Sequence, residues 1–201
     1  MNKLLLTASA AMLALTLGGC GQKAEQTTDA VANSASETAD TAGAMAANAM
    51  VDAEQALTPT PGGQEFVNKA ANTDAYEIAA AKLAQTNAAS PDVKAFAAEM
   101  IKAHTDSTAK IKAAAATASP AMVPDAALTA DQNDELAELA KKKGAEFDDA
   151  YIEEQVDVHQ TALAMMRDYA EKGDTPSLRT AAGEIAPVVQ KHLDHARSLD
   201  K

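Results

Sequence analysis

The feature that most constrains the fold of this chain is a helical pattern that occurs twice, once near the middle of the sequence and once near its end. Residues 90–100 read SPDVKAFAAEM and residues 175–185 read TPSLRTAAGEI, and the two segments align without a gap. Each begins with a hydroxyl side chain suited to capping a helix and a proline suited to the first helical position. Upstream, Glu65-Phe66 corresponds to Glu146-Phe147. The pattern predicts a duplicated helical hairpin; the alternative is chance similarity between two common helix-start sequences.

An all-α domain is predicted over residues 64–201. Alanine, the best helix former, supplies much of the hydrophobic fraction, and only 3% of the residues are aromatic. Apolar residues recur at three- and four-residue spacing, and strand-forming residues rarely alternate. The expected helices cover about 64–86, 90–118, 129–172 and 175–199.

Two interruptions and one long connection organise these helices. Thr73 can cap a restart of the first helix after Asn72, and Gly144 is expected to break the third. The connection at residues 119–129, which holds two prolines, can span about 35 Å when extended. A single long crossover between the middle helices is typical of ferritin-like bundles. We therefore predict a ferritin-like four-helix bundle built from two similar helical hairpins.

The first twenty residues have the form of a bacterial export signal. Residues 4–17 are an apolar run after a lysine, too short for a comfortable membrane span. The run ends Leu17-Gly18-Gly19-Cys20, which resembles the lipobox of bacterial lipoproteins. We predict that residues 1–19 are removed and that Cys20, the sole cysteine, carries the lipid that anchors the chain to a membrane. The alternative is an ordinary signal peptide with a chance cysteine.

The segment between the anchor and the domain is predicted to be a flexible tether, residues 20–63. It is rich in small polar residues and alanine, and it cannot bury enough apolar surface to offset its ordering entropy. By resemblance to Gram-negative sorting, Gly21 in place of aspartate favours the outer membrane, facing the periplasm. The net charge of −12 argues against nucleic acid as a partner. The sequence identifies no protein partner.

Four polar residues, one from each helix, are the candidates for chemistry. Glu77 and His104 lie nearly the same number of residues either side of Ser90, and His159 and His192 do so about Thr175, so all four are expected near mid-height. Imidazoles with a carboxylate suit one transition-metal ion, the only cofactor indicated. The alternatives are a layer of buried polar residues bonded to one another, and proton or redox chemistry.

A di-iron redox enzyme of the ferritin-like type is disfavoured by the ligand spacing. Such enzymes use two Glu-x-x-His motifs, but Glu99 precedes His104, and Glu184 precedes His192, by more than three residues. Met165-Met166 is interpreted as core packing and not as a soft-metal site.

Helix-face residues across the domain resemble a family of exported bacterial proteins, domain of unknown function family 4142. The matching residues are Phe96-Ala97, Met100-Ile101, His104, Phe147-Asp148, Tyr151, Gln155-Val156, His159 and His192-Leu193. The resemblance implies export, a helical bundle and often a lipoprotein anchor, but no established activity. We therefore expect a membrane-anchored periplasmic lipoprotein, non-enzymatic, that serves as an envelope or stress-related binding protein; the alternative is a periplasmic metal-binding protein.

Overall fold

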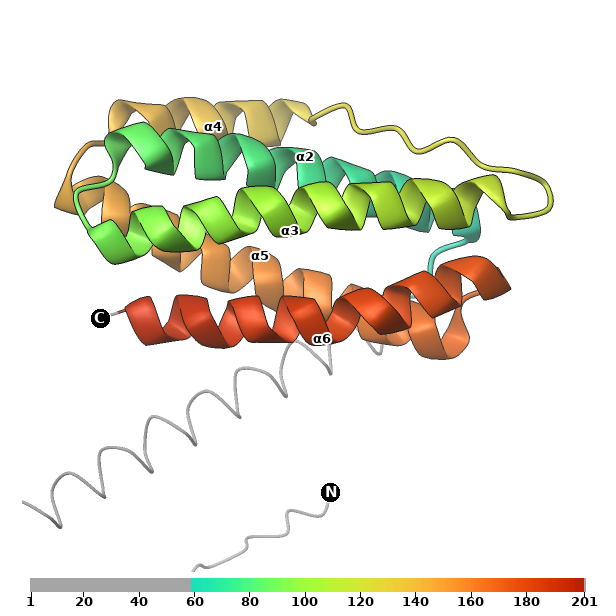
Figure 1. Cartoon of the computed structure of the whole chain (residues 1–201). Helices are drawn as coiled ribbons and strands as arrows, with labels where there is room; N and C mark the ends of the chain where they lie inside the picture. The colour runs from blue at the N-terminus through green and yellow to red at the C-terminus, as the bar shows by residue number, and fades with distance from the viewer. Residues whose placement is uncertain (1–58, 201) are drawn as a thin grey trace, which may run out of the picture. The chain divides into compact units, whose positions relative to one another are not determined.

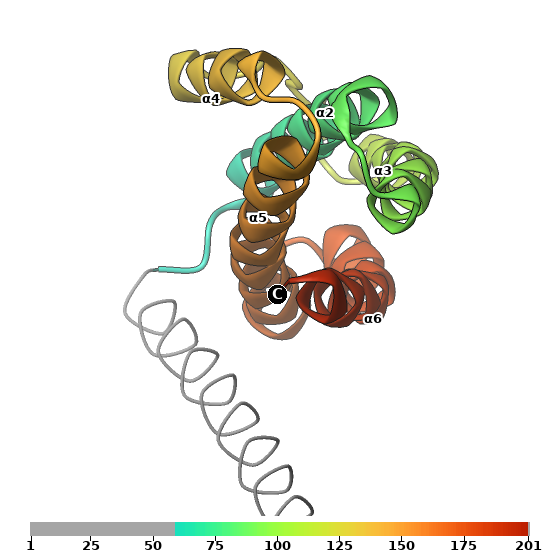
Figure 2. The same cartoon turned by 90° about the vertical axis from the view of Figure 1, so that its left-hand side faces the viewer.

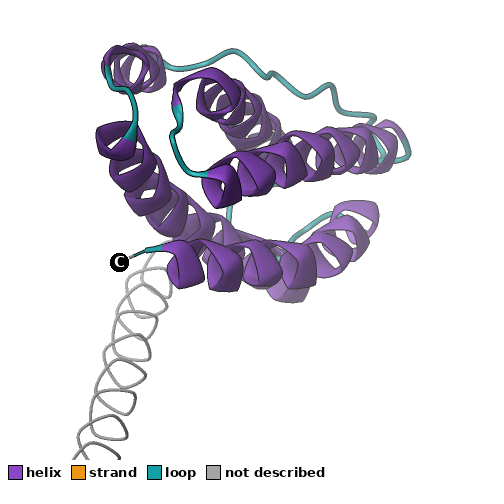
Figure 3. Cartoon of the chain, turned by 60° about the vertical axis from the view of Figure 1, so that its left-hand side comes forward, coloured by secondary structure: helices purple, strands orange, loops and turns teal. Residues whose placement is uncertain are grey.

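The computed structural model describes residues 59–200, which form helices joined by loops (Figure 1, Figure 3). No strand occurs in this range, and the all-α prediction is confirmed. The signal peptide, Cys20 and nearly all of the tether lie outside the described residues. None of the helices within 59–200 is long and apolar enough to cross a membrane. The helices are α2 (Gly63–Asn87), α3 (Pro91–Ala116), α4 (Ala130–Lys141), α5 (Ala145–Lys172) and α6 (Pro176–Leu199).

Local sequence signals set several of the helix ends. Ser90 accepts a hydrogen bond from the Val93 N–H, and α3 starts at the following proline, as predicted. The break at Gly144 is also confirmed: this glycine has φ 66°, a conformation that side chains disfavour. It separates α4 from α5. The side chain of Thr175, in contrast, makes no cap hydrogen bond to α6.

The predicted interruption of the first helix at Asn72-Thr73 is wrong, because α2 runs without a break from Gly63 to Asn87. The Asn72 side chain donates a hydrogen bond to the carbonyl of Ala127 in the long connection. The Asn72 side chain, which the sequence suggested would interrupt the helix, therefore bonds to a segment distant in sequence and leaves α2 continuous.

The long helices pack in pairs. α2 packs against α3, and α5 against α6, while α3 contacts α6 and α2 contacts α5. Viewed along their length, these four helices lie together and α4 lies outside them, against α2 (Figure 2). The long connection, residues 117–129, runs back along the molecule to the start of α4 (Figure 1).

Two apolar clusters fill the interior, and a polar layer separates them. One contains Phe66, Ile111, Leu163, Tyr169, Leu178 and Leu193 among others, and the second contains Val93, Phe96, Met100, Phe147 and Tyr151 among others. Apart from Asn87 at the end of α2, the buried polar residues of α2, α3 and α5 lie between the two clusters in sequence, and that of α6 lies where the clusters meet. These residues are Asp74, Glu77, His104, Gln155, His159 and His192.

Candidate metal centre

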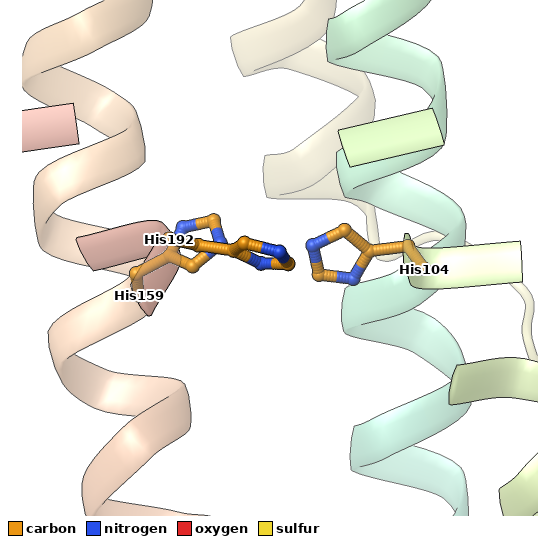
Figure 4. Close-up of side chains that lie close together, drawn as sticks. All are labelled: His104, His159 and His192. Atoms are coloured by element: carbon orange, nitrogen blue, oxygen red, sulfur yellow. The ribbon is translucent and has the colours of Figure 1, made fainter. Parts of the chain in front are cut away.

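Three imidazoles from three helices meet in the polar layer: His104 of α3, His159 of α5 and His192 of α6 (Figure 4). One ring nitrogen from each lies within 4.8 Å of the others. The ring centroids are 5.5 to 6.0 Å apart. The three residues are 6%, 1% and 4% exposed. We call them the histidine trio.

The apolar stripes of the helices hold the trio in place. His104 continues the buried stripe of α3 through Phe96, Met100 and Ile111. His159 lies on the buried face of α5, and His192 follows Ile185 and Val189 on α6. Because residues three and four apart share a helix face, packing these stripes together also turns the imidazoles inward.

A hydrogen bond to a carboxylate orients His104. Its Nδ1 lies 2.8 Å from Asp74 Oδ1, and Thr108 donates a bond of 3.0 Å to the other carboxylate oxygen. Because a carboxylate accepts, Nδ1 of His104 donates, and Nε2 keeps its lone pair. Histidines that bind metals commonly have such a carboxylate behind the ring. The Nε2 atom of His104 is buried and has no hydrogen-bond partner.

The other two imidazoles also keep one nitrogen without a partner. Nδ1 of His159 donates to the backbone carbonyl of Gln155 at 2.9 Å, which leaves its Nε2 as a buried acceptor. His192 has a buried, unpartnered Nδ1, and its Nε2 lies 4.0 Å from Glu99 Oε1. Buried polar atoms are nearly always hydrogen-bonded. Three unpartnered ring nitrogens in one place are therefore unusual, and they match the donor set of a metal site.

The protonation state of His159 and His192 suits metal binding. Burial lowers the pKa of His159 to about 3, with the neighbouring His104 and His192 adding to the effect. Burial likewise lowers the pKa of His192 to about 4. Burial also lowers the pKa of His104, but the Asp74 hydrogen bond and the nearby Glu77 carboxylate outweigh it and raise the pKa. His159 and His192 are thus neutral at physiological pH, the form that coordinates metals.

Glu77, the fourth predicted ligand, lies beside the trio and not within it. Its side chain is fully buried near His104, but its oxygens do not belong to the group within 4.8 Å, and neither has a hydrogen-bond partner. Burial raises its pKa to about 7, although His104 and the adjacent Gln155 amide lower it. The Gln155 amide and the Tyr151 hydroxyl also lack hydrogen-bond partners. The structure therefore brings three of the four predicted residues together.

A small cavity adjoins the trio. Its volume is about 30 Å³, and its lining includes His104, His192, Met165 and Met166. A space of this size holds one or two water-sized particles. The two methionines, which the sequence suggested were core packing, thus line the same space as two of the imidazoles.

Sequence reasoning missed Asp74, the hydrogen-bond partner of His104. The signal was present, because Asp74 lies three residues before Glu77 and hence on the same face of α2. The glutamates that precede His104 and His192 in sequence are not buried with the trio, as a di-iron site would require. Glu184 pairs with Lys110 at the surface, and Glu99 is half exposed.

The chain matches one family model and is similar in fold to solved structures. A family model described as Domain of unknown function (DUF4142) matches residues 46–199, which confirms the resemblance inferred from the sequence. No curated protein matches. The structure of CopM in the Cu(I)-bound form is similar, with a TM-score of 0.57 and 16% identity over 69% of this chain and 94% of that one. CopM in the Ag-bound form, obtained by co-crystallization, gives a TM-score of 0.56 and 18% identity over the same shares.

Proposed function

We propose that this chain, which belongs to the Domain of unknown function (DUF4142) family, is a non-enzymatic metal-binding protein that holds one transition-metal ion in the histidine trio. The observation that carries the proposal is the set of three buried ring nitrogens, one each from His104, His159 and His192, that have no hydrogen-bond partner. Leaving such atoms unmet costs about 1–3 kcal/mol each. Coordination of one metal ion would give all three nitrogens a partner.

Copper in its monovalent state is the ion that the surroundings favour. His159 and His192 are neutral and supply donors without charge, and a monovalent ion loses less hydration energy on burial than a divalent one. The thioethers of Met165 and Met166 line the adjoining cavity, and soft sulfur donors select Cu(I). The similarity to CopM, solved in Cu(I)-bound and Ag-bound forms, is consistent with this choice.

The test is an anaerobic Cu(I) titration against a coloured Cu(I) chelator. Full-length chain with Cys20→Ser is used, because this change removes the only thiol. We expect one tightly bound equivalent. His159→Gln should lower the affinity more than about 100-fold, since changes behind a ligand already cost about 10–100-fold. Asp157→Asn, on the same helix but at the surface, is the control and should bind like the parent.

Two results would contradict the proposal. One is the absence of a bound equivalent in the parent protein with Cu(I), Cu(II) or Zn(II). The other is unchanged affinity in His159→Gln, provided that its melting curve without metal shows a folded protein. Either result would leave the trio as a layer of buried polar residues that pack against one another, the alternative from the sequence.

The site is proposed to work at the bacterial envelope, on a lipid anchor at Cys20. The support is the sequence Leu17-Gly18-Gly19-Cys20 after an apolar run, with Gly21 favouring the outer membrane and the periplasmic side. Fractionation checks this: the parent chain should sediment with membranes and incorporate labelled palmitate. Cys20→Ser should do neither, and label in that variant would contradict the assignment.

The pairing of the long helices supports the finer fold prediction, a ferritin-like four-helix bundle built from two similar hairpins. α2 pairs with α3 and α5 with α6, and the longest connection lies between the two pairs. In such bundles, metal sites form in the core from side chains on facing helices. The histidine trio has this position.

A further inference from the structure

A surface groove between α3 and α6 leads to one member of the histidine trio. Its volume is about 420 Å³, and its lining includes Glu99, Ser107, Ile185 and His192. Ser107, Ile185 and His192 also line the small cavity beside the trio. The groove and the cavity therefore meet at His192, which forms the boundary between the surface and the buried site.

Glu99 joins two histidines at this groove. Its Oε2 lies 3.2 Å from Nδ1 of His195, and its Oε1 lies 4.0 Å from Nε2 of His192. The side chains of Glu99 and His195 are 50% and 42% exposed, whereas that of His192 is 5% exposed. A single carboxylate thus reaches an accessible imidazole with one oxygen and a buried imidazole with the other.

The two nitrogens of His192 face different surroundings. Nδ1 is buried and has no partner, while Nε2 lies toward Glu99. One nitrogen of this imidazole faces the groove and the other faces the buried site. The ring can therefore bind an ion on the groove side and then, after it rotates, on the cavity side. The small cavity beside His192 offers space for this rotation.

Two of the three lysines that line the groove around Glu99 are paired with other carboxylates, and the third is Lys191. Lys102 pairs with Asp106 at 2.7 Å, and Lys110 pairs with Glu184, so these two lysines are neutralised by other carboxylates. The net charge of −12 also attracts cations to the molecule. The carboxylate of Glu99 lies 4.0 Å from Nε2 of His192, a member of the trio.

We propose that Glu99 and His195 form a loading site that captures the metal ion at the surface and passes it through His192 to the histidine trio. This inference rests on the proposed function. Across residues 59–200, only the trio brings three candidate ligand atoms within 4.8 Å of one another. The loading site has fewer ligands than the trio and should therefore bind the ion more weakly. Weak binding there allows the ion to move on to the trio.

Stopped-flow uptake of Cu(I) tests the loading site. The chain has three tyrosines and no tryptophan, so tyrosine fluorescence reports binding in full-length chain with Cys20→Ser. Glu99→Gln keeps the side-chain volume and removes the charge. We expect it to lower the uptake rate constant about tenfold or more, and to slow release into excess chelator by a similar factor. His195→Gln should slow both in the same direction.

Asp157→Asn is the matched control, because Asp157 lines the other large groove, between α2 and α5. That groove also reaches the small cavity, through Thr73, Ala162 and Met165. We expect the parent rates in this variant. Melting of each variant without metal verifies that it is folded.

The outcomes separate the two proposals. Parent rates in Glu99→Gln, or an equal slowing in Asp157→Asn, overturn the loading site while the buried site stands. Slowing in Asp157→Asn alone assigns the route to the α2–α5 groove and also overturns it. Failure of the parent chain to bind Cu(I) overturns the proposed function and this inference with it.

Discussion

Replacing Glu77 with glutamine is expected to stabilise the metal-free protein at neutral and alkaline pH. The carboxyl of Glu77 is fully buried, and neither oxygen has a hydrogen-bond partner. Burial accordingly raises its pKa from 4.5 to about 7. An ionised carboxylate in this position loses its hydration, and the nearby His104 and Gln155 amide compensate only part of that loss. Glutamine fills the same space and has no charge to lose.

The sign and size of the effect follow from the pKa. Between pH 4.5 and 7 the folded chain holds a proton on Glu77 that the unfolded chain has released, so stability falls as the pH rises. Above pH 7 the loss is complete, and one pKa unit corresponds to about 1.4 kcal/mol. The advantage of Glu77→Gln over the parent should therefore grow by about 3 kcal/mol between pH 4.5 and 8.

The assay is urea unfolding of both proteins at a series of pH values in the presence of a chelator. Any unmet hydrogen bond of the glutamine amide shifts the two curves by an amount that does not depend on pH, so the change with pH reports the ionisation of Glu77 together with its effect on His104. Glu65→Gln, exposed on the same helix, is the control and should show a nearly constant difference. A constant difference for Glu77→Gln as well would refute the reasoning.

Three further predictions concern the site and its frame. Asp74→Asn should weaken Cu(I) binding about 10–100-fold in the chelator titration, because the ring of His104 loses its carboxylate partner. Leu178→Ala should cost about 2–5 kcal/mol in urea unfolding, because Leu178 is fully buried in an apolar cluster. Gly144→Ala should cost about 1–3 kcal/mol in the same assay: the added methyl group meets nothing within 4 Å, but φ is 66° and ψ is −139°, a conformation that residues with a side chain rarely adopt.

The start of α3 and the break before α5 could be predicted from the sequence because their causes are local. Ser90 and Pro91 set the first turn of α3 through their own hydroxyl group and ring. Gly144 separates two helices because it adopts a positive φ, which residues with a side chain disfavour. Asn72 misled the prediction, since its side chain bonds to Ala127, which is distant in sequence.

The convergence of the three histidines was also within reach of the sequence. Helical rise places side chains at nearly equal distances from a turn at the same height, and the apolar stripes give the face that turns inward. These two rules brought His104, His159 and His192 to one level. They did not give the position of Glu77 relative to the trio, because this depends on the rotation of α2 against its neighbours.

The sequence by itself therefore determined the helices, several of their ends and the height of the polar layer, because these follow from interactions within one or two turns. Only the tertiary structure decided that Asp74 bonds to His104, that Glu77 stays without a partner and that Glu99 reaches both His192 and His195. Each of these features depends on how side chains from different helices meet. Packing of whole helix faces sets their rotation and offset, and no short stretch of sequence contains that information.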